Sequence, residues 1–113
     1  IRIDGTSFYA ELYDNEAAHE FASMLPLTVE MSDLHANEKY YYLPESLPTD
    51  AHRPGSIRTG DLMLYGSDCI VLFYKDFSTS YSYTPLGRIQ DTQGLEHVLG
   101  SAEAEITFRQ QNR

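Results

Sequence analysis

The chain has 113 residues, of which 42% are hydrophobic, and this is enough for one domain with one buried core. Its 8 lysines and arginines face 17 aspartates and glutamates, and the formal net charge of −9 would repel the phosphates of nucleic acids and anionic membranes. No apolar run approaches the roughly 20 residues of a membrane span. Cys69, the single cysteine, excludes an internal disulfide and a multi-cysteine zinc site.

These limits predict one domain over residues 1–113 that needs no cofactor and no metal, with neither nucleic acid nor a membrane span among its partners. Because the chain starts with Ile1 rather than methionine, we expect that a preceding segment has been removed. Composition leaves a cytoplasmic and an exported location open. It does not decide the oligomeric state.

The first 13 residues predict a β-hairpin. They alternate around Asp4-Gly5, a turn pair that is favoured because glycine adopts positive φ without steric cost. One face of the second arm carries Phe8, Ala10 and Leu12.

A helix and a strand are expected next. Asp14 is the predicted N-cap, Glu16 suits the first turn, and Pro26 ends the helix. The apolar stripe at helical spacing consists of Ala18, Phe21, Ala22 and Leu25. Alternation then returns, with the inward side chains at Leu27, Val29 and Met31.

Regular pattern is lost over residues 35–59. This segment holds three of the five prolines and is polar apart from residues 40–43. We therefore predict a long irregular connection, and such loops are uncommon inside a domain and often functional.

The strongest β pattern lies at residues 60–74. Residues 62–65 alternate, Gly66-Ser67 suits a tight hairpin turn, and residues 69–74 form an apolar run typical of a strand covered on both faces. Gly60-Asp61 is expected to turn the chain and to bind backbone N–H groups before the strand.

The remaining elements are short. Residues 77–84 alternate, with Tyr81 and Tyr83 on the aromatic side, and Pro85 is expected to end this extended piece before a strand at residues 86–89. A short helix should be capped by Asp91 or Thr92 and closed by Gly100. The last strand has its inward side chains at Ala104, Ile106 and Phe108.

The pattern predicts seven or eight strands and two short helices, and strands at this density favour a closed barrel. The order of elements resembles that of cyclophilins, with “GDLML”, “IVLFY” and “LGRI” leading into a short helix. The chain is more similar still to small bacterial cyclophilin-like proteins, whose role is largely undefined, through “LPESLP”, “GDLMLYG”, “VLFY” and “YSYTPLGRI”. This resemblance covers nearly the whole chain and implies a mostly β, small closed cyclophilin-like barrel.

The departures from true cyclophilins bear on activity. A prolyl isomerase lowers a barrier of roughly 18–20 kcal/mol, and in cyclophilins an arginine in an “FHRV”-like strand and a glutamine in a “QFFI”-like strand contribute. Neither string occurs here, although Phe73 matches a pocket phenylalanine. Arg58 and Arg88 are the arginines near strands that would have to substitute. We therefore name no catalytic residue and expect no active isomerase.

The resemblance places a candidate ligand groove between the 40–48 loop and the strands around Phe73. Its candidate residues are Tyr42, Glu45, Arg58, Phe73, Tyr81, Tyr83 and Arg88. Aromatic rings there would supply contact area and hydroxyl groups. The alternative is that the tyrosines only pack in the barrel and that Glu45 is solvated or caps a turn.

Other residue types carry weaker signals. Cys69 is expected to be a small buried hydrophobic residue. Asp33, His35 and Glu38 form a loose acidic cluster that could hold a metal, but solvated loop groups are the expected outcome.

Three functions stay open at this point, because a fold does not by itself imply a function. The leading hypothesis is a non-catalytic module that binds a peptide or a small molecule. The second is a weak peptidyl-prolyl isomerase with Arg58 or Arg88 as hydrogen-bond donor. The third is an acidic assembly piece that associates through its tyrosines.

Overall fold

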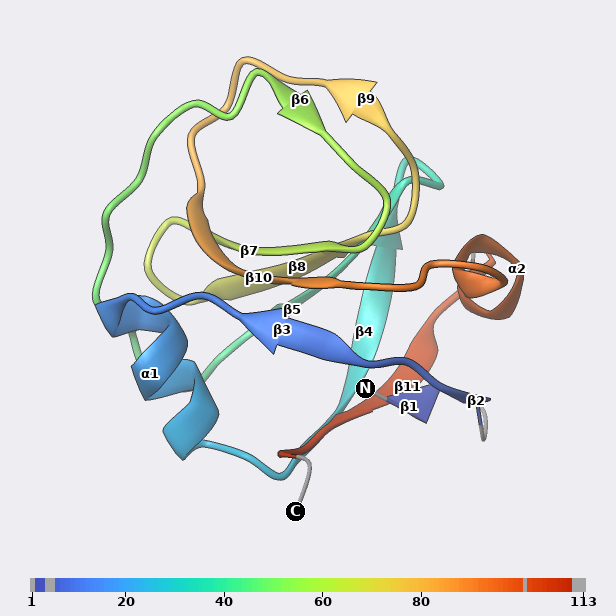
Figure 1. Ribbon diagram of the computed structural model, residues 1–113, viewed down its shortest axis with the longest axis horizontal. Helices are drawn as coiled ribbons and strands as arrows, with labels where there is room; N and C mark the ends of the chain where they lie inside the picture. The colour runs from blue at the N-terminus through green and yellow to red at the C-terminus, as the bar shows by residue number, and fades with distance from the viewer. Residues whose placement is uncertain (1, 4–5, 101, 111–113) are drawn as a thin grey trace.

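The computed structural model describes residues 2–3, 6–100 and 102–110, and these form a mostly β fold with two short helices (Figure 1). The helices are α1 (Glu16–Ser23) and α2 (Leu95–Leu99). The strands are β1 (Arg2–Ile3), β2 (Thr6–Ser7), β3 (Ala10–Leu12), β4 (Leu27–Leu34), β5 (Glu38–Tyr42), β6 (Ser56–Ile57), β7 (Asp61–Tyr65), β8 (Cys69–Phe73), β9 (Phe77–Ser78), β10 (Thr84–Ile89) and β11 (Ala104–Phe108).

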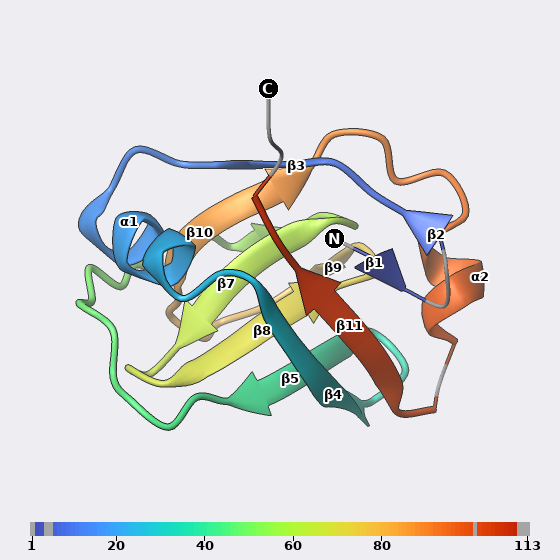
Figure 2. The ribbon, with the colours of Figure 1, turned by 90° about the horizontal axis from the view of Figure 1, so that it is seen from below.

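Within the described residues, nine strands join in one antiparallel sheet, in the order β2-β1-β11-β4-β5-β8-β7-β10-β3. The seven strands of three or more residues curl strongly into a half-barrel, as Figures 1 and 2 show. The predicted mostly β, barrel-like fold with two short helices is therefore confirmed. β6 and β9 form a separate two-stranded sheet that arches over β7 and β8 (Figure 1).

The main core fills the concave side of the half-barrel. Strand side chains alternate between the two faces, and the predicted inward residues of the last strand are 7%, 0% and 2% exposed at Ala104, Ile106 and Phe108. Phe108 meets Phe21 of α1 edge-to-face, with ring centroids 5.6 Å apart. α1 therefore packs on the core, but its buried residues include Ala17, which the predicted stripe omitted, whereas Ala22 is only half-buried.

The N-cap of α1 is Asn15, so the prediction of Asp14 was wrong. The Asn15 side chain accepts a hydrogen bond from the Ala18 backbone N–H at 2.7 Å and donates one to the Pro85 carbonyl at 2.9 Å. An amide can make both bonds at once, whereas a carboxylate can only accept. Asn15 therefore caps the helix and also fastens it to β10.

The irregular connection expected over residues 35–59 is wrong in its first part, where β5 pairs with both β4 and β8. Glu38 and Lys39 concealed this strand because both are polar and both are buried. β6 lies near the end of the same segment and pairs with β9. The tyrosines of residues 40–42 are therefore on a strand and not in a loop.

Residues 77–89 also differ from the prediction. β9 covers only Phe77 and Ser78, and Tyr83 forms an isolated bridge with His52. β10 includes Pro85 instead of following it, because the pairing with β7 shifts between Pro85 and Gly87. Proline is tolerated at such a bulge, where a ladder hydrogen bond is already missing.

The turns follow the predicted chemistry at several positions. Gly60 and Gly66 have φ of 94° and 62°, and the Asp61 carboxylate accepts the Arg58 backbone N–H at 2.9 Å. Gly100 closes α2 with φ of 55°, as expected. The N-cap of α2 is Gly94 and not Asp91 or Thr92, because the left-handed φ of 83° at this turn favours glycine.

The N-terminal hairpin is shorter than expected. β1 and β2 pair with each other, but the next arm leaves as β3 and pairs with β10. The predicted Asp4-Gly5 turn lies outside the described residues. Neither described helix has the length and apolar character that a membrane crossing requires.

Candidate functional site

The strands β5, β7 and β8 carry a second, smaller apolar cluster on the side that faces away from the main core. All five residues of β8 are buried, as its apolar run predicted. Because side chains alternate along a strand, Ile70 and Leu72 enter the main core while Val71 and Phe73 belong to this second cluster. Its buried members are Ile57, Met63, Cys69, Val71, Phe73 and Tyr83, with Tyr40 and Phe77 packed against them.

Seven aromatic side chains gather over this cluster, and we call them the aromatic face. They are Tyr40, Tyr42, Tyr65, Phe73, Phe77, Tyr81 and Tyr83. Strand register accounts for the outer ones, because Cys69 pairs with Tyr42 on one side and with Tyr65 on the other. β-Pairing therefore brings Tyr42 and Tyr65 close together although they are far apart in the sequence.

Ring contacts link most of the aromatic face into one chain. Phe73 lies 5.6 Å from Phe77 and 5.5 Å from Tyr83, measured between ring centroids. Tyr83 lies 5.6 Å from Tyr65, and Tyr65 lies 6.0 Å from Tyr81. These distances and the tilted or edge-to-face orientations are those that aromatic pairs prefer.

Exposure divides the aromatic face into a floor and a rim. Phe73 and Tyr83 are 0% and 4% exposed, whereas Tyr65 is 44% exposed and Tyr42 and Tyr81 are each 61% exposed. The floor contacts Tyr65 directly and Tyr81 through Tyr65, whereas the ring contact of Tyr42 is with Tyr40. The rim tyrosines are therefore exposed to solvent above a layer of buried aromatic side chains.

Two backbone connections hold the covering segments in place. His52 and Tyr83 exchange both backbone hydrogen bonds, at 3.1 and 3.0 Å. Ile57 pairs with Phe77 in the small β6–β9 sheet. These bridges help to hold Tyr83 and Phe77 against Phe73.

The electrostatics of the aromatic face disfavour nucleophilic chemistry. Burial, and then the nearby negative charges of Asp68 and Glu38, raise the pKa of Cys69 to about 11. Burial, followed by the charge of Glu38, also raises the pKa of Tyr83. Both groups therefore stay protonated at neutral pH, and the thiol is not a reactive thiolate.

Glu38 is a polar residue of the same region, which the sequence analysis placed in a loose acidic cluster and expected to be a solvated loop group. It lies opposite Phe73 in the β5–β8 ladder and is 9% exposed. Burial raises the pKa of its carboxyl group, while the charge of His35 acts in the opposite direction. No described residue forms a hydrogen bond or an ion pair with this side chain. The missing β5 prediction is what hid its position.

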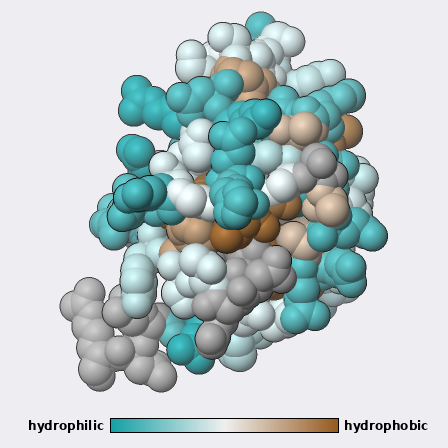
Figure 3. Space-filling model, turned by 90° about the vertical axis from the view of Figure 1, so that its right-hand side faces the viewer, coloured by the Kyte–Doolittle hydropathy of each residue, from teal (hydrophilic) through white to brown (hydrophobic). Residues whose placement is uncertain are grey.

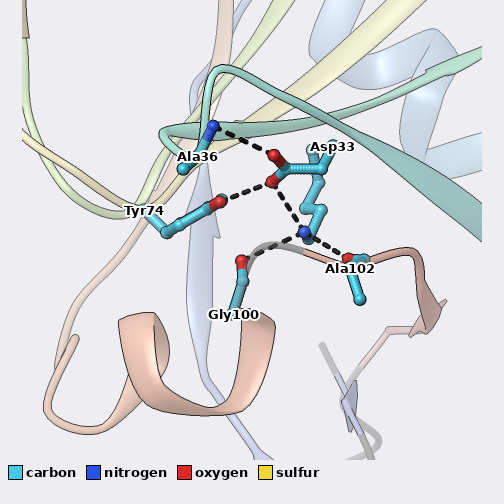
Figure 4. Close-up of polar contacts among 6 residues, drawn as sticks. Asp33, Ala36, Tyr74, Gly100 and Ala102 are labelled. Carbon is cyan, nitrogen blue, oxygen red and sulfur yellow. Dashed lines mark hydrogen bonds and ion pairs between the residues drawn. The ribbon is translucent and has the colours of Figure 1, made fainter.

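The neighbouring Lys39 points to the opposite side of β5. It enters a polar network with Asp33 and Tyr74, and Figure 4 shows the labelled members of this network. Its ammonium donates to the Asp33 carboxylate at 2.7 Å and to the carbonyls of Gly100 and Ala102. Tyr74 also donates to Asp33. The three donors of the lysine are therefore all used, which is typical of a structural ion pair.

This network also explains why the predicted acidic cluster of Asp33, His35 and Glu38 does not form a metal site. Burial alone would raise the pKa of Asp33, but hydrogen bonds from Lys39, Tyr74 and the Ala36 backbone outweigh it and lower the pKa. Asp33 and Glu38 point to opposite sides, so the two carboxylates do not converge. Among the described residues, no group of three histidine, cysteine, aspartate or glutamate side chains is arranged to hold a metal.

A family comparison bears on the whole chain. The model of a family described as the Cyclophilin-like family matches residues 1–109. The chain belongs to the Cyclophilin-like family. No curated protein and no solved structure matches it. The family agrees with the curled half-barrel and supplies no residue roles.

In this cyclophilin-like domain, four of the seven predicted site residues come together. Tyr42, Phe73, Tyr81 and Tyr83 all belong to the aromatic face. Glu45 is exposed in the segment after β5 and has no described side-chain partner. The structure therefore unites the aromatic candidates and leaves this carboxylate in solvent.

The two candidate arginines of the cyclophilin-like domain do not join the aromatic face. Arg88 is exposed on β10, where it pairs with Asp61 and Glu11 of the adjacent strands. Arg58 is exposed and lines an open polar hollow beside α2, together with Asp76 and Glu96. On that side of the molecule, hydrophilic side chains surround a smaller area of hydrophobic ones (Figure 3).

Proposed function

We propose that this cyclophilin-like domain is a non-catalytic binding module that holds a peptide or a small molecule on its aromatic face. The observation that carries the proposal is the exposed rim of Tyr42, Tyr65 and Tyr81 on a buried aromatic floor. Large exposed aromatic patches on soluble proteins mark interaction sites more often than isolated exposed side chains do.

The energetics of tyrosine favour this role. A tyrosine side chain offers a large contact area and a hydroxyl group, yet only two torsions must be fixed when a ligand binds. The ring contact of Tyr65 with Tyr83 reduces this remaining freedom before a ligand arrives. A preorganised aromatic rim therefore loses little conformational entropy on binding.

Prolyl isomerisation would need a guanidinium beside Phe73. No described hydrogen bond or cation–π contact joins Arg58 or Arg88 to that ring. A protease-coupled peptide assay on the wild type, Arg58→Ala and Arg88→Ala separates the two functions. We expect the uncatalysed rate in all three, and a wild-type rate that either substitution abolishes would support the isomerase instead.

A ligand screen tests the binding proposal. Short proline-containing peptides and small-molecule fragments are titrated into the 15N-labelled domain, and chemical-shift changes are followed. We expect hits whose affinity falls by about fivefold or more in Tyr42→Ala and Tyr81→Ala, since aromatic residues dominate binding energy at such sites. Tyr9→Ala is the matched control, because Tyr9 is also 61% exposed but lies beside β3. Silent spectra at millimolar ligand would count against the proposal.

A further inference from the structure

Glu38 is a nearly buried residue whose carboxylate has no partner among the described residues. The residue is 9% exposed, and its carboxylate has no hydrogen bond or ion pair with any described residue. Most buried polar groups are hydrogen-bonded, so each exception calls for an explanation. Leaving a charged group in this state lowers stability.

The surroundings of Glu38 suit a positive charge. Tyr40 is two residues away on the same face of β5, and Phe73 lies opposite on β8. The charge of Glu38 also reaches Tyr83, because it contributes to the raised pKa of that phenol. Aromatic ring faces carry negative electrostatic potential and attract ammonium and guanidinium groups, most strongly where water is excluded. A carboxylate among such rings strengthens this attraction.

No described cation of the chain fills the position. Lys39 points to the other face of β5 and is fully engaged by Asp33 and two carbonyls. His35 acts on Glu38 electrostatically but makes no described contact with it, and Asp33 adds a negative charge. The net charge of −9 would also favour the approach of a cation.

The shape of the aromatic face points to a peptide as the source of that cation. Its rim is open, since Tyr42 and Tyr81 are each 61% exposed, whereas small-molecule sites usually enclose most of their ligand. A hollow formed by described residues lies beside α2, away from the aromatic face. Because Glu38 is nearly buried, the cation must arrive on a long, thin side chain whose stem packs on apolar surface.

We propose that the aromatic face binds a peptide through a lysine or arginine side chain, whose charged group pairs with the Glu38 carboxylate among the rings of Tyr40 and Tyr83. This inference rests on the proposed binding function and gives it a ligand class. Glu38 would then be an anchoring residue that is left unpaired in the free protein.

Two matched peptides test this inference on the 15N-labelled full chain. Acetyl-Ala-Lys-Ala-amide carries the cation, and acetyl-Ala-norleucine-Ala-amide carries a similar aliphatic chain without it. We expect the lysine peptide to bind about tenfold more tightly, which corresponds to about 1.4 kcal/mol. In Glu38→Gln this preference should disappear, while the norleucine peptide keeps its affinity. Glu20→Gln, at an exposed residue of α1, removes the same charge and should keep the preference.

The outcomes separate this inference from the function on which it rests. Equal binding of both peptides to the aromatic face would overturn the cation anchor and leave the binding module standing. The same follows if Glu38→Gln retains the preference. If n-butylamine binds as tightly as the lysine peptide, the occupant is a free amine, and the peptide part is wrong. If neither peptide nor any screened ligand binds, both proposals fall.

Discussion

Glu38 and Lys39 are adjacent charged residues that the fold treats in opposite ways. Strand geometry sends their side chains to opposite faces of β5. Lys39 is 0% exposed and donates to three acceptors, while Glu38 is 9% exposed and has no described partner. The contacts of Lys39 stabilise the fold. The unpaired carboxylate of Glu38 lowers the stability of the free protein, and a ligand that pairs with it would restore that stability.

Glu38→Gln should stabilise the free protein, and the gain should depend on pH. Burial raises the folded-state pKa of Glu38 above its ordinary value of 4.5. The protonated group therefore contributes stability that is fully present below pH 4.5 and is lost as the pH rises through the folded-state pKa. Glutamine does not titrate, so we expect a gain of about 1 kcal/mol at pH 7 and a smaller one at pH 4. Thermal unfolding at both pH values checks this, and an equal gain at both would contradict it.

Lys39→Met should be strongly destabilising, because Lys39 is fully buried and its loss leaves the Asp33 carboxylate, 15% exposed, and two carbonyls with fewer donors. Breaking a buried ion pair on one side costs about 3–5 kcal/mol. Lys75→Met is the control, since the exposed Lys75 ammonium lies 3.4 Å from Glu96 and such pairs contribute about 1 kcal/mol or less. Urea unfolding measures both. Similar losses of unfolding free energy in the two variants would contradict the stabilising role of the Lys39 network.

Among the elements, β3 depends on a glycine in the neighbouring strand. Gly87 of β10 pairs with Leu12, and a Cβ atom added at Gly87 would lie 2.5 Å from the Glu11 carbonyl oxygen. β3 is a terminal strand of the described sheet. Its attachment therefore requires a close backbone approach that only glycine permits.

Gly87→Ala should loosen β3 from β10 and destabilise the fold by about 1–3 kcal/mol. Gly66→Ala is the comparison, because a Cβ atom there meets nothing within 4 Å and only the positive φ of 62° is unfavourable. Amide hydrogen exchange should show faster exchange at Tyr13, whose N–H bonds to the Leu86 carbonyl, in Gly87→Ala alone. Unchanged exchange there would contradict this account of β3.

Strands with a regular spacing of apolar residues could be predicted from the sequence, whereas a strand with buried polar residues could not. Alternation located β4 and β11, and the apolar run located β8, because apolar side chains on these strands face a core. β5 escaped detection since Glu38 and Lys39 conceal its periodicity. Pro85 concealed the start of β10, because a bulge makes room for it. Local pattern does not reveal a buried charge or a bulge.

The candidate site shows the same division. Four of its seven aromatic residues were candidates, through the alternation after Phe77, the 40–48 segment and the family resemblance, whereas Tyr65 was not. Their meeting depends on strand register, in which Tyr42, Cys69 and Tyr65 become neighbours across three strands. Glu38 could not be placed without β5. Glu45 was a candidate only through its loop, and its side chain stays exposed.

For the molecule as a whole, net charge and the aromatic face should act together. A charge of −9 attracts cations over a distance that salt shortens. We expect affinity for the lysine peptide to fall severalfold between about 0.02 and 0.5 M NaCl, while that for the norleucine peptide changes little. Isothermal titration across this range measures it. An affinity for the lysine peptide that is independent of salt would contradict an electrostatic contribution.

The most direct test of the central claim is an intermolecular NOE experiment between a bound peptide and the tyrosine ring protons. If the aromatic face is the binding surface, NOEs should connect the ligand to Tyr65 and Tyr81, and Tyr9 should show none. NOEs that instead reach Thr92 and His97, which line the hollow beside α2, would contradict the claim.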